Sequence, residues 1–362
     1  MTKTIVNNID KSQSSQSVSS LAQAWAKKYM QSLSVETEHG NSDLFDKDST
    51  LSQEGRQKTA EKLQKALRFT SSQAWAKTEA LLAQQVQNHN LDPDLIDPWQ
   101  ISVDCHALFD KTLEIYAQRS ASQTSISEKN SSQSSTDLIS PAKLATKISK
   151  DIGRVRYKYT AKDPRVLGFV SMQFHYSGQM LLDLLNPIEK TAVGSYLKVI
   201  DDHLYMPLER AYDAAADLTY NSPELLAVRD LMPITSEISK TVCEKVISLY
   251  PYYNCYSGQL QSQAIKSSSL RDVEMFQIYL CLCVLEGNIS SIQEELFPIC
   301  VMLYPPLKVS WDLIRNMLRL LGQELSYRLN PSDVDLFSPY INAMSQMFSE
   351  EILMDRPTLV AA

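Results

Sequence analysis

Glycine is scarce in this sequence, with nine residues among 362. This scarcity argues against a fold that depends on many tight turns. Leu, Ala, Gln, Glu and Lys, which favour or tolerate helices, are common instead. No segment shows the two-residue periodicity of a strand over a convincing length. The composition therefore predicts an all-α protein.

Long apolar runs are also missing. No stretch reaches the roughly 18–20 residues that a membrane-spanning helix needs, and the apolar run Val273–Leu285 begins directly beside Arg271 and Asp272. The first residues lack the apolar core of a signal peptide. The net charge of −7 argues against nucleic acid as a general partner. We expect a cytoplasmic protein.

Paired cysteines and clustered histidines are absent as well. No CxxC pair and no Cys/His cluster occurs, which excludes the common zinc motifs and a disulfide framework. Asp201, Asp202 and His203 form too small a set for a metal site and are expected on a solvated helix face. No Ser/His/Asp order and no phosphate-binding loop is visible, so we expect no enzyme activity. The six cysteines are expected to be reduced and mostly structural: Cys105, Cys243, Cys255, Cys281, Cys283 and Cys300.

Two tracts rich in Ser and Gln, Ser12–Ser20 and Arg119–Ser140, predict flexible segments. Helices are expected over residues 55–87, with a break near 70–72, and over 101–118. From Pro141 onward the chain is typical of consecutive helices. The expected organisation is an N-terminal helical region over 1–118 with a low-complexity start, a linker over 119–140, a helical pair over 141–186, a larger domain over 187–354 and a tail over 355–362.

A basic stripe marks the start of the helical pair. Lys143, Lys147, Lys150 and Arg154 share one helix face because they are spaced by three or four residues. Residues 143–165 contain eight basic and two acidic side chains. Two interpretations remain open, namely a solvated face and a face that docks on an acidic partner or on anionic lipid headgroups.

Residues 269–317 contain the most specific pattern. Arg271 and Asp272 precede the apolar run, Gly287-Asn288 follows it, and two further helices are expected over 290–304 and 309–329. With the segments 224–250 and 340–348, this order resembles the phycobiliproteins, the globin-fold light-harvesting subunits of cyanobacteria. The resemblance implies a globin-like, phycobiliprotein-type domain over about 187–350, preceded by a partly disordered helical region.

The same resemblance implies partners and a location. The segment 141–186 is similar to the helical pair through which these subunits form dimers, so the expected partners are phycobilisome proteins or related globin-like subunits, in a hetero- or homo-dimer. Contact with a membrane is expected to be peripheral at most, at the cytoplasmic face of the thylakoid. Cyanobacterial origin is implied in the same way.

One substitution separates this chain from the family pattern. Ser269 stands where the family has the cysteine that binds the bilin, and a hydroxyl does not form the thioether. The resemblance implies that Arg271 pairs with a bilin propionate and that Asp272 accepts hydrogen bonds from the pyrrole N–H groups. Cys255, in the preceding loop, is an alternative tether. A competing interpretation needs no pigment, since Ser269-x-x-Asp272 also matches a capping box at a helix start.

Aromatic residues near this motif are expected either to line a bilin slot or to fill it: Tyr250, Tyr252, Tyr253, Tyr256 and Phe276. Haem is not expected, because the segment 294–304 has no histidine. Three functions remain open. The first is a non-catalytic interaction protein without covalent bilin that acts in phycobilisome structure, assembly or regulation. The second is a protein that binds a bilin non-covalently, as a carrier or light-harvesting subunit. The third is a globin-like sensor or regulatory domain.

Overall fold

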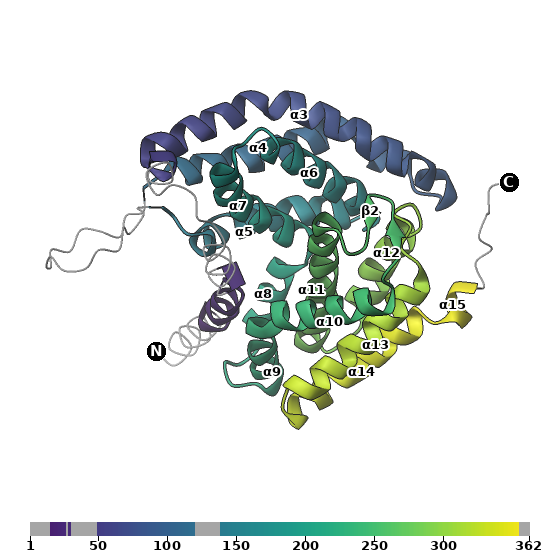
Figure 1. The fold of residues 1–362 in the computed structure, drawn as a ribbon. Helices are drawn as coiled ribbons and strands as arrows, with labels where there is room; N and C mark the ends of the chain where they lie inside the picture. The colour runs from purple at the N-terminus through teal and green to yellow at the C-terminus, as the bar shows by residue number, and fades with distance from the viewer. Residues whose placement is uncertain (1–14, 27, 30–48, 120–137, 355–362) are drawn as a thin grey trace, which may run out of the picture. The chain divides into compact units, whose positions relative to one another are not determined.

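The structure is a computed structural model that describes residues 15–26, 28–29, 49–119 and 138–354. Nearly all of these residues lie in helices (Figure 1), which confirms the predicted all-α fold. The chain forms two compact units that alternate along the sequence. Residues 26–159 and 169–204 belong to the N-terminal unit, and residues 1–25, 160–168 and 205–362 to the C-terminal unit. This division differs from the sequence-based organisation, in which 141–186 stood apart.

The N-terminal unit is built on two helices that pack along each other, α3 and α4. Its elements are α3 (Gln53–Asn88), the short 3-10 helix η2 (Pro93–Leu95), α4 (Pro98–Ala117), α5 (Pro141–Thr160), most of α6 (Val166–Leu182) and α7 (Pro187–Tyr205). The expected break near residues 70–72 is wrong, since α3 is continuous there. The hydroxyl of Thr70 donates to the carbonyl of Ala66 at 3.1 Å, which lets a β-branched polar residue continue the helix.

The Ser- and Gln-rich start of the chain is only partly as predicted. Residues 15–26 are helical, and Ser17, Leu21 and Trp25 are each fully buried. Because these three residues recur every four positions, they share one helix face, and burial of Leu21 and Trp25 stabilises a segment that composition alone marks as flexible. Most of the predicted linker 119–140, the start of the first tract and the tail 355–362 lie outside the described residues.

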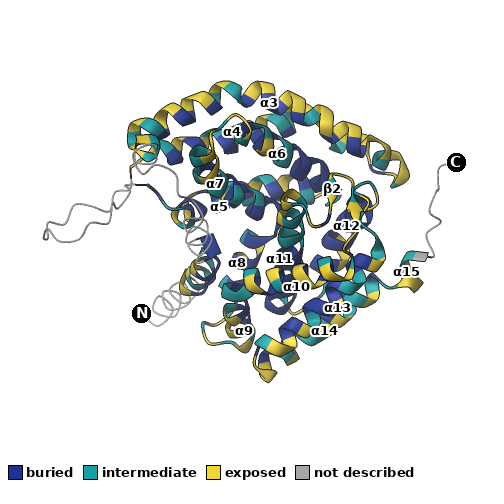
Figure 2. Cartoon of the chain, in the orientation of Figure 1, coloured by how far each residue is buried: buried dark blue, intermediate teal, exposed yellow. Residues whose placement is uncertain are grey.

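The C-terminal unit is arranged around α11, which contacts α8, α9, α10, α14 and η4. Every residue from Val273 to Leu285 is buried (Figure 2), as the apolar run predicted. Helix α11 spans Gln263–Glu286. The other elements are α8 (Leu208–Ala216), α9 (Pro223–Leu231), η3 (Met232–Ile234), α10 (Thr235–Leu249), β1 (Asn254–Cys255), β2 (Gly258–Gln259), the π-helix η4 (Ser291–Leu296), α12 (Phe297–Leu303), α13 (Trp311–Arg328), α14 (Pro331–Met347) and α15 (Glu350–Met354). The two short strands pair antiparallel.

Helix boundaries in this unit follow residues that the sequence makes recognisable. The Ser222 hydroxyl accepts a hydrogen bond from the Leu225 amide at 3.3 Å, and Pro223 opens α9. Asn330 caps α14 in the same way, accepting from the Asp333 amide at 3.0 Å. Gly287 ends α11 with a φ of 66°, a left-handed conformation that glycine adopts without strain. Pro207 lies between the end of α7 and the start of α8, where a proline is tolerated.

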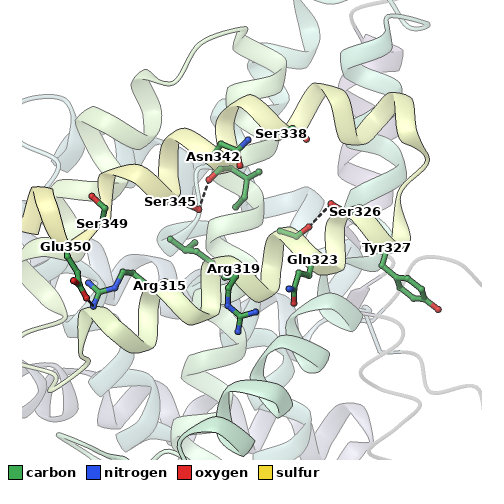
Figure 3. Close-up of a pocket in the computed structure, with 13 residues that line it drawn as sticks. Arg315, Arg319, Gln323, Ser326, Tyr327, Ser338, Asn342, Ser345, Ser349 and Glu350 are labelled. Carbon is green, nitrogen blue, oxygen red and sulfur yellow. Dashed lines mark hydrogen bonds and ion pairs between the residues drawn. The ribbon is translucent and has the colours of Figure 1, made fainter.

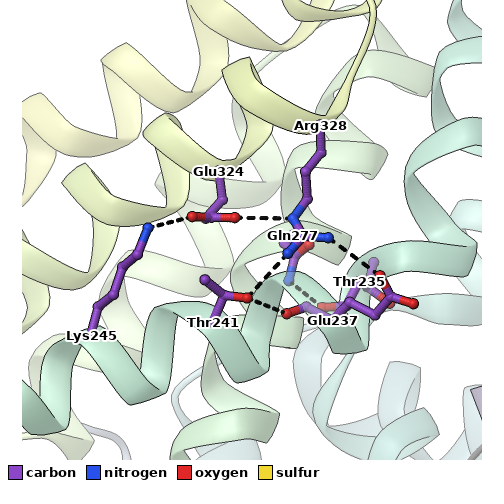
Figure 4. Close-up of polar contacts among 7 residues, drawn as sticks. All are labelled: Thr235, Glu237, Thr241, Lys245, Gln277, Glu324 and Arg328. Carbon is purple, nitrogen blue, oxygen red and sulfur yellow. Dashed lines mark hydrogen bonds and ion pairs between the residues drawn. The ribbon is translucent and has the colours of Figure 1, made fainter.

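Ion pairs join α10 to α13 (Figure 4). Glu324, which is buried, accepts from Lys245 at 2.5 Å and from Arg328 at 3.0 Å. The guanidinium of Arg328 also reaches Glu237 at 3.3 Å. A carboxylate that is shielded from water needs such partners, because burying it alone is expensive. The network therefore fixes the register of α10 against α13.

Candidate functional site

Ser269, Arg271 and Asp272 lie inside α11 and not at its start. The helix begins six residues before Ser269, with Ser262 at its N-cap position. The capping-box interpretation is therefore wrong. The hydroxyl of Ser267 donates to the carbonyl of Gln263 at 3.0 Å, and that of Ser268 to Ala264 at 3.3 Å. These bonds to the preceding turn allow the serine run to be helical.

Tyr205, the last residue of α7, engages both residues of the Arg-Asp pair. Its hydroxyl donates a hydrogen bond to Oδ1 of Asp272 at 3.1 Å. The guanidinium carbon of Arg271 lies 4.3 Å from the centre of the Tyr205 ring, within the range of a cation–π contact. Tyr205 is only 8% exposed. One aromatic residue thus holds the two side chains to which the resemblance assigns bilin contacts.

The pKa of the Asp272 carboxyl is raised toward neutral pH. Burial raises its pKa to about 6, while the Arg271 charge and the Tyr205 hydrogen bond oppose a further rise. Its negative charge in turn contributes to raising the pKa of three neighbouring thiols, namely Cys243, Cys255 and Cys300, although burial is the main cause for each. Asp272 therefore acts electrostatically on a group of weakly acidic thiols.

Cys255 lies in β1 and is the one cysteine of the six that is not fully buried. Its raised pKa keeps the thiol protonated at neutral pH, which lowers its nucleophilicity. The structure therefore brings the alternative tether into the electrostatic range of Asp272, but as an unactivated thiol.

The predicted aromatic lining is wrong for the tyrosines of the loop. Tyr252 is 89% exposed and Tyr256 is 53% exposed. The Tyr253 hydroxyl donates to the carbonyl of Lys308 at 2.8 Å, and Tyr250 bonds to Asp312, so both tie the loop to the region where α13 begins. Phe276 packs against Phe348 in the core, with ring centres 6.0 Å apart. Tyr205, which no sequence motif marks, occupies the position beside Asp272.

Tyr205 occupies the two groups to which the resemblance assigns the tetrapyrrole. The donor set is chemically suitable, since a guanidinium binds carboxylates and a carboxylate accepts from N–H groups. However, the Asp272 carboxylate and the face of Arg271 are already engaged by Tyr205, a buried side chain. Ser269 also offers no thiol. The residues present favour a filled site over one that is open to pigment.

A groove of about 850 Å³ lies between α13 and α14 (Figure 3). None of its lining residues is a predicted bilin contact. Three of its serines donate to carbonyls of their own helices, as Ser326 does to Gly322 at 3.0 Å and Ser345 to Ile341 at 2.8 Å. At one end Arg315 pairs with Glu350 at 3.2 Å. Several polar groups of the groove are thus already bonded within the protein.

The predicted basic stripe lies on α5, and its four side chains are all exposed: Lys143, Lys147, Lys150 and Arg154. The other member of the expected helical pair is different. Most of α6 is buried, with Phe174 against Phe109 of α4 at 5.5 Å and Gln173 bonded to Ser71 of α3 at 2.9 Å. Of the expected dimerising pair, only the outer face of α5 is available to a partner.

The expectation of a solvated face at Asp201–His203 is wrong for two of the three residues. Asp202 is fully buried, 3.1 Å from both Lys28 and Lys198, and it accepts from the Tyr29 hydroxyl at 3.1 Å. Burial alone would raise the pKa of Asp202, but the two lysines outweigh it and hold that pKa well below the usual range. The Nδ1 atom of His203 lies 2.9 Å from the Val199 carbonyl. This cluster is structural.

Across the described residues, no group of three or more His, Cys, Asp or Glu side chains is placed to hold a metal ion. Within the same residues, no helix combines the length and apolarity needed to cross a bilayer.

Comparison with known proteins adds one finding. Residues 198–348 match the model of a protein family described as phycobilisome protein. The match begins at the end of α7 and extends through α14, so it includes Tyr205, Ser269, Arg271 and Asp272. No curated protein and no solved structure matches the chain. Members of this family normally bind bilins and are generally not enzymes. Over residues 198–348, less than half of its length, the chain is therefore similar to the phycobilisome protein family.

Proposed function

We propose that this chain is a non-catalytic phycobiliprotein-like protein that carries no covalent bilin. It acts by binding other phycobilisome proteins, in the structure, assembly or regulation of the light-harvesting complex. The observation that carries the proposal is the state of the family's pigment site. Ser269 replaces the attaching thiol, and Tyr205 engages both Arg271 and Asp272.

Exposed side chains of the C-terminal unit suit a protein partner. Tyr252 in the loop before α11 is 89% exposed, and Tyr327, which lines the α13–α14 groove near the end of α13, is 85% exposed (Figure 3). Aromatic residues are enriched at protein interfaces because they bury a large area for little conformational entropy. We place the partner contact on this unit, since the expected helical pair is reduced to the outer face of α5.

The proposed absence of a covalent bilin is tested by co-producing the full chain with a bilin and the enzymes that attach it. We expect colourless protein, with no visible absorbance after purification under denaturing or native conditions. The variant Tyr205→Ala should be tested in parallel, because it removes the side chain that engages Asp272. Visible absorbance of the wild-type chain that is shifted or abolished in Asp272→Asn would contradict the proposal.

The proposed binding to phycobilisome proteins is tested by a pull-down from isolated phycobilisomes with the tagged full chain. We expect capture of phycobiliprotein subunits, reduced about tenfold or more in the double variant Tyr252→Ser/Tyr327→Ser. Tyr157→Ser, on the N-terminal unit, is the matched control and should bind as the wild type does. Absence of any phycobilisome protein in the pull-down would argue instead for the sensor hypothesis.

A second candidate function rests on the placement of Cys255. It is partly exposed, and the Asp272 charge acts on it, so the thiol lies near the Arg-Asp pair. In this alternative the chain holds a bilin at Arg271 and Asp272, with Cys255 beside it. Absorbance that survives native but not denaturing purification supports non-covalent binding. Colour that survives denaturation and disappears in Cys255→Ser supports a covalent bond to that residue.

A further inference from the structure

The helix α5 separates its apolar and basic residues onto opposite sides. Leu144, Ile148 and Ile152 are completely buried in the protein. Lys143, Lys147, Lys150 and Arg154 fall within an arc of about 60° on the outer side, because each residue advances about 100° around the helix. Tyr157, which is 73% exposed, extends the same arc. These five residues are called the α5 basic face.

Three of these charges have no counter-charge in the part of the chain that the structure describes. Asp151 pairs with Arg154 and with Lys111 of α4, and Lys158 pairs with Asp104 of α4 at 2.7 Å. Lys143, Lys147 and Lys150 form no ion pair with any described carboxylate. Asp104 and Asp151 are thus already paired with Lys158, Lys111 and Arg154 and do not neutralise these three lysines.

The composition of this face fits a membrane surface better than a protein. Stable protein interfaces have an apolar or aromatic centre and are depleted in lysine. The α5 basic face has one aromatic residue at its end and lysines along its length. Anionic lipid headgroups require no apolar centre, and each lysine or arginine near them contributes independently. A tyrosine is also suited to the headgroup layer, because its ring is apolar and its hydroxyl polar.

We propose that the α5 basic face docks the protein on a bilayer that contains anionic phospholipid. The helix lies parallel to the surface over about 30 Å. Leu144, Ile148 and Ile152 remain in the protein core, so the contact is electrostatic and does not insert. This proposal goes beyond the proposed function and does not depend on it, since it concerns the N-terminal unit and holds with or without a phycobilisome partner.

The test is co-sedimentation of the full chain with vesicles of phosphatidylcholine containing an increasing fraction of phosphatidylglycerol. We expect binding that rises with the anionic fraction and is lost at about 0.5 M NaCl, where exposed charges are screened. The triple variant Lys143→Glu/Lys147→Glu/Lys150→Glu should lower the partition coefficient by on the order of 100-fold or more. Tyr157→Ala should lower it by a smaller factor.

A matched control separates this face from overall charge. Lys65→Glu/Arg68→Glu/Lys240→Glu changes the net charge equally at three exposed positions on α3 and α10, and it should retain substantially more binding than the α5 variant. Circular dichroism melting confirms that both triple variants fold. Equal loss in the two variants, or no binding of the wild type to anionic vesicles, overturns the proposal. A wild type that ignores vesicles but captures acidic proteins through these lysines assigns the face to a protein partner instead.

Discussion

The hydroxyl of Tyr205 and the carboxylate of Asp272 are joined by a 3.1 Å hydrogen bond between the end of α7 and the buried helix α11. The two residues are 67 positions apart in sequence. The bond stabilises the ionised form of a carboxyl group whose pKa burial raises to about 6. The contribution of this contact to stability should therefore depend on pH near neutrality.

Tyr205→Phe tests the contact directly. The variant keeps the ring beneath Arg271 and removes only the hydroxyl, so Asp272 loses a donor and its pKa should rise. We expect the free energy of unfolding to fall by about 1–2 kcal/mol at pH 8, as for a hydrogen bond to a charged group, and by less at pH 5, where Asp272 is largely protonated. Urea unfolding at the two pH values measures this. An equal loss at both would show that the bond does not involve the ionised carboxylate.

Asp272→Asn isolates the pH dependence of the carboxyl itself. A group whose folded pKa is raised stabilises the protein below its unfolded pKa and loses that contribution as pH rises through the folded value. From the ordinary value near 4 to the folded value of about 6, the loss is on the order of 3 kcal/mol. The stability of the variant relative to the wild type should thus increase by roughly this amount between pH 4 and pH 7. A flat difference across this range would refute the raised pKa.

A pair of serine substitutions tests where α11 begins. Ser310 caps α13 by accepting from the Leu313 amide at 3.3 Å, and Ser310→Ala should lower the free energy of unfolding by about 1 kcal/mol. Ser269 lies within α11, so Ser269→Ala should change it by less than about 0.5 kcal/mol. Thermal or urea unfolding of both variants gives the comparison. A loss at Ser269 as large as that at Ser310 would restore the capping interpretation.

The buried pair Lys28–Asp202 makes a further prediction. Lys28 is 4% exposed and Asp202 is fully buried. Lys28→Met removes one of the two cations that hold Asp202 ionised, and we expect a loss of on the order of 3 kcal/mol. Lys198→Met should be milder, since Lys198 is 42% exposed. The double variant Lys28→Met/Asp202→Asn should recover part of the loss, because no buried charge is then left without its partner. Urea unfolding of the single and double variants forms the measurement.

The fold was predictable where the chain carries helix-breaking or helix-capping residues. Ser222-Pro223, Asn330-Pro331 and Gly287 mark helix ends for local reasons, so they can be recognised without tertiary information. Serine and threonine runs misled the prediction at 70–72 and at 267–269. A hydroxyl can cap a helix or bond back to the preceding turn. The choice is decided by what the segment packs against, which no local pattern contains.

The site was predictable in part. The motif around Arg271 and Asp272 drew attention to the correct segment of α11 and to the missing thiol at Ser269. Its principal partner, Tyr205, was not found, because it lies 67 positions away in the sequence and only the folding of the C-terminal unit brings it close. The burial of Asp202 escaped the prediction for the same reason, since its partner Lys28 lies far from it in the sequence.

The hydroxyl at position 269 has an optical consequence. Neither serine nor tyrosine absorbs visible light, so the non-pigmented subunit that we propose would offer no energy level to an excitation from a coloured neighbour. If it occupies a place in an antenna, it would act there as a transparent spacer that sets distances between dyes held by other chains.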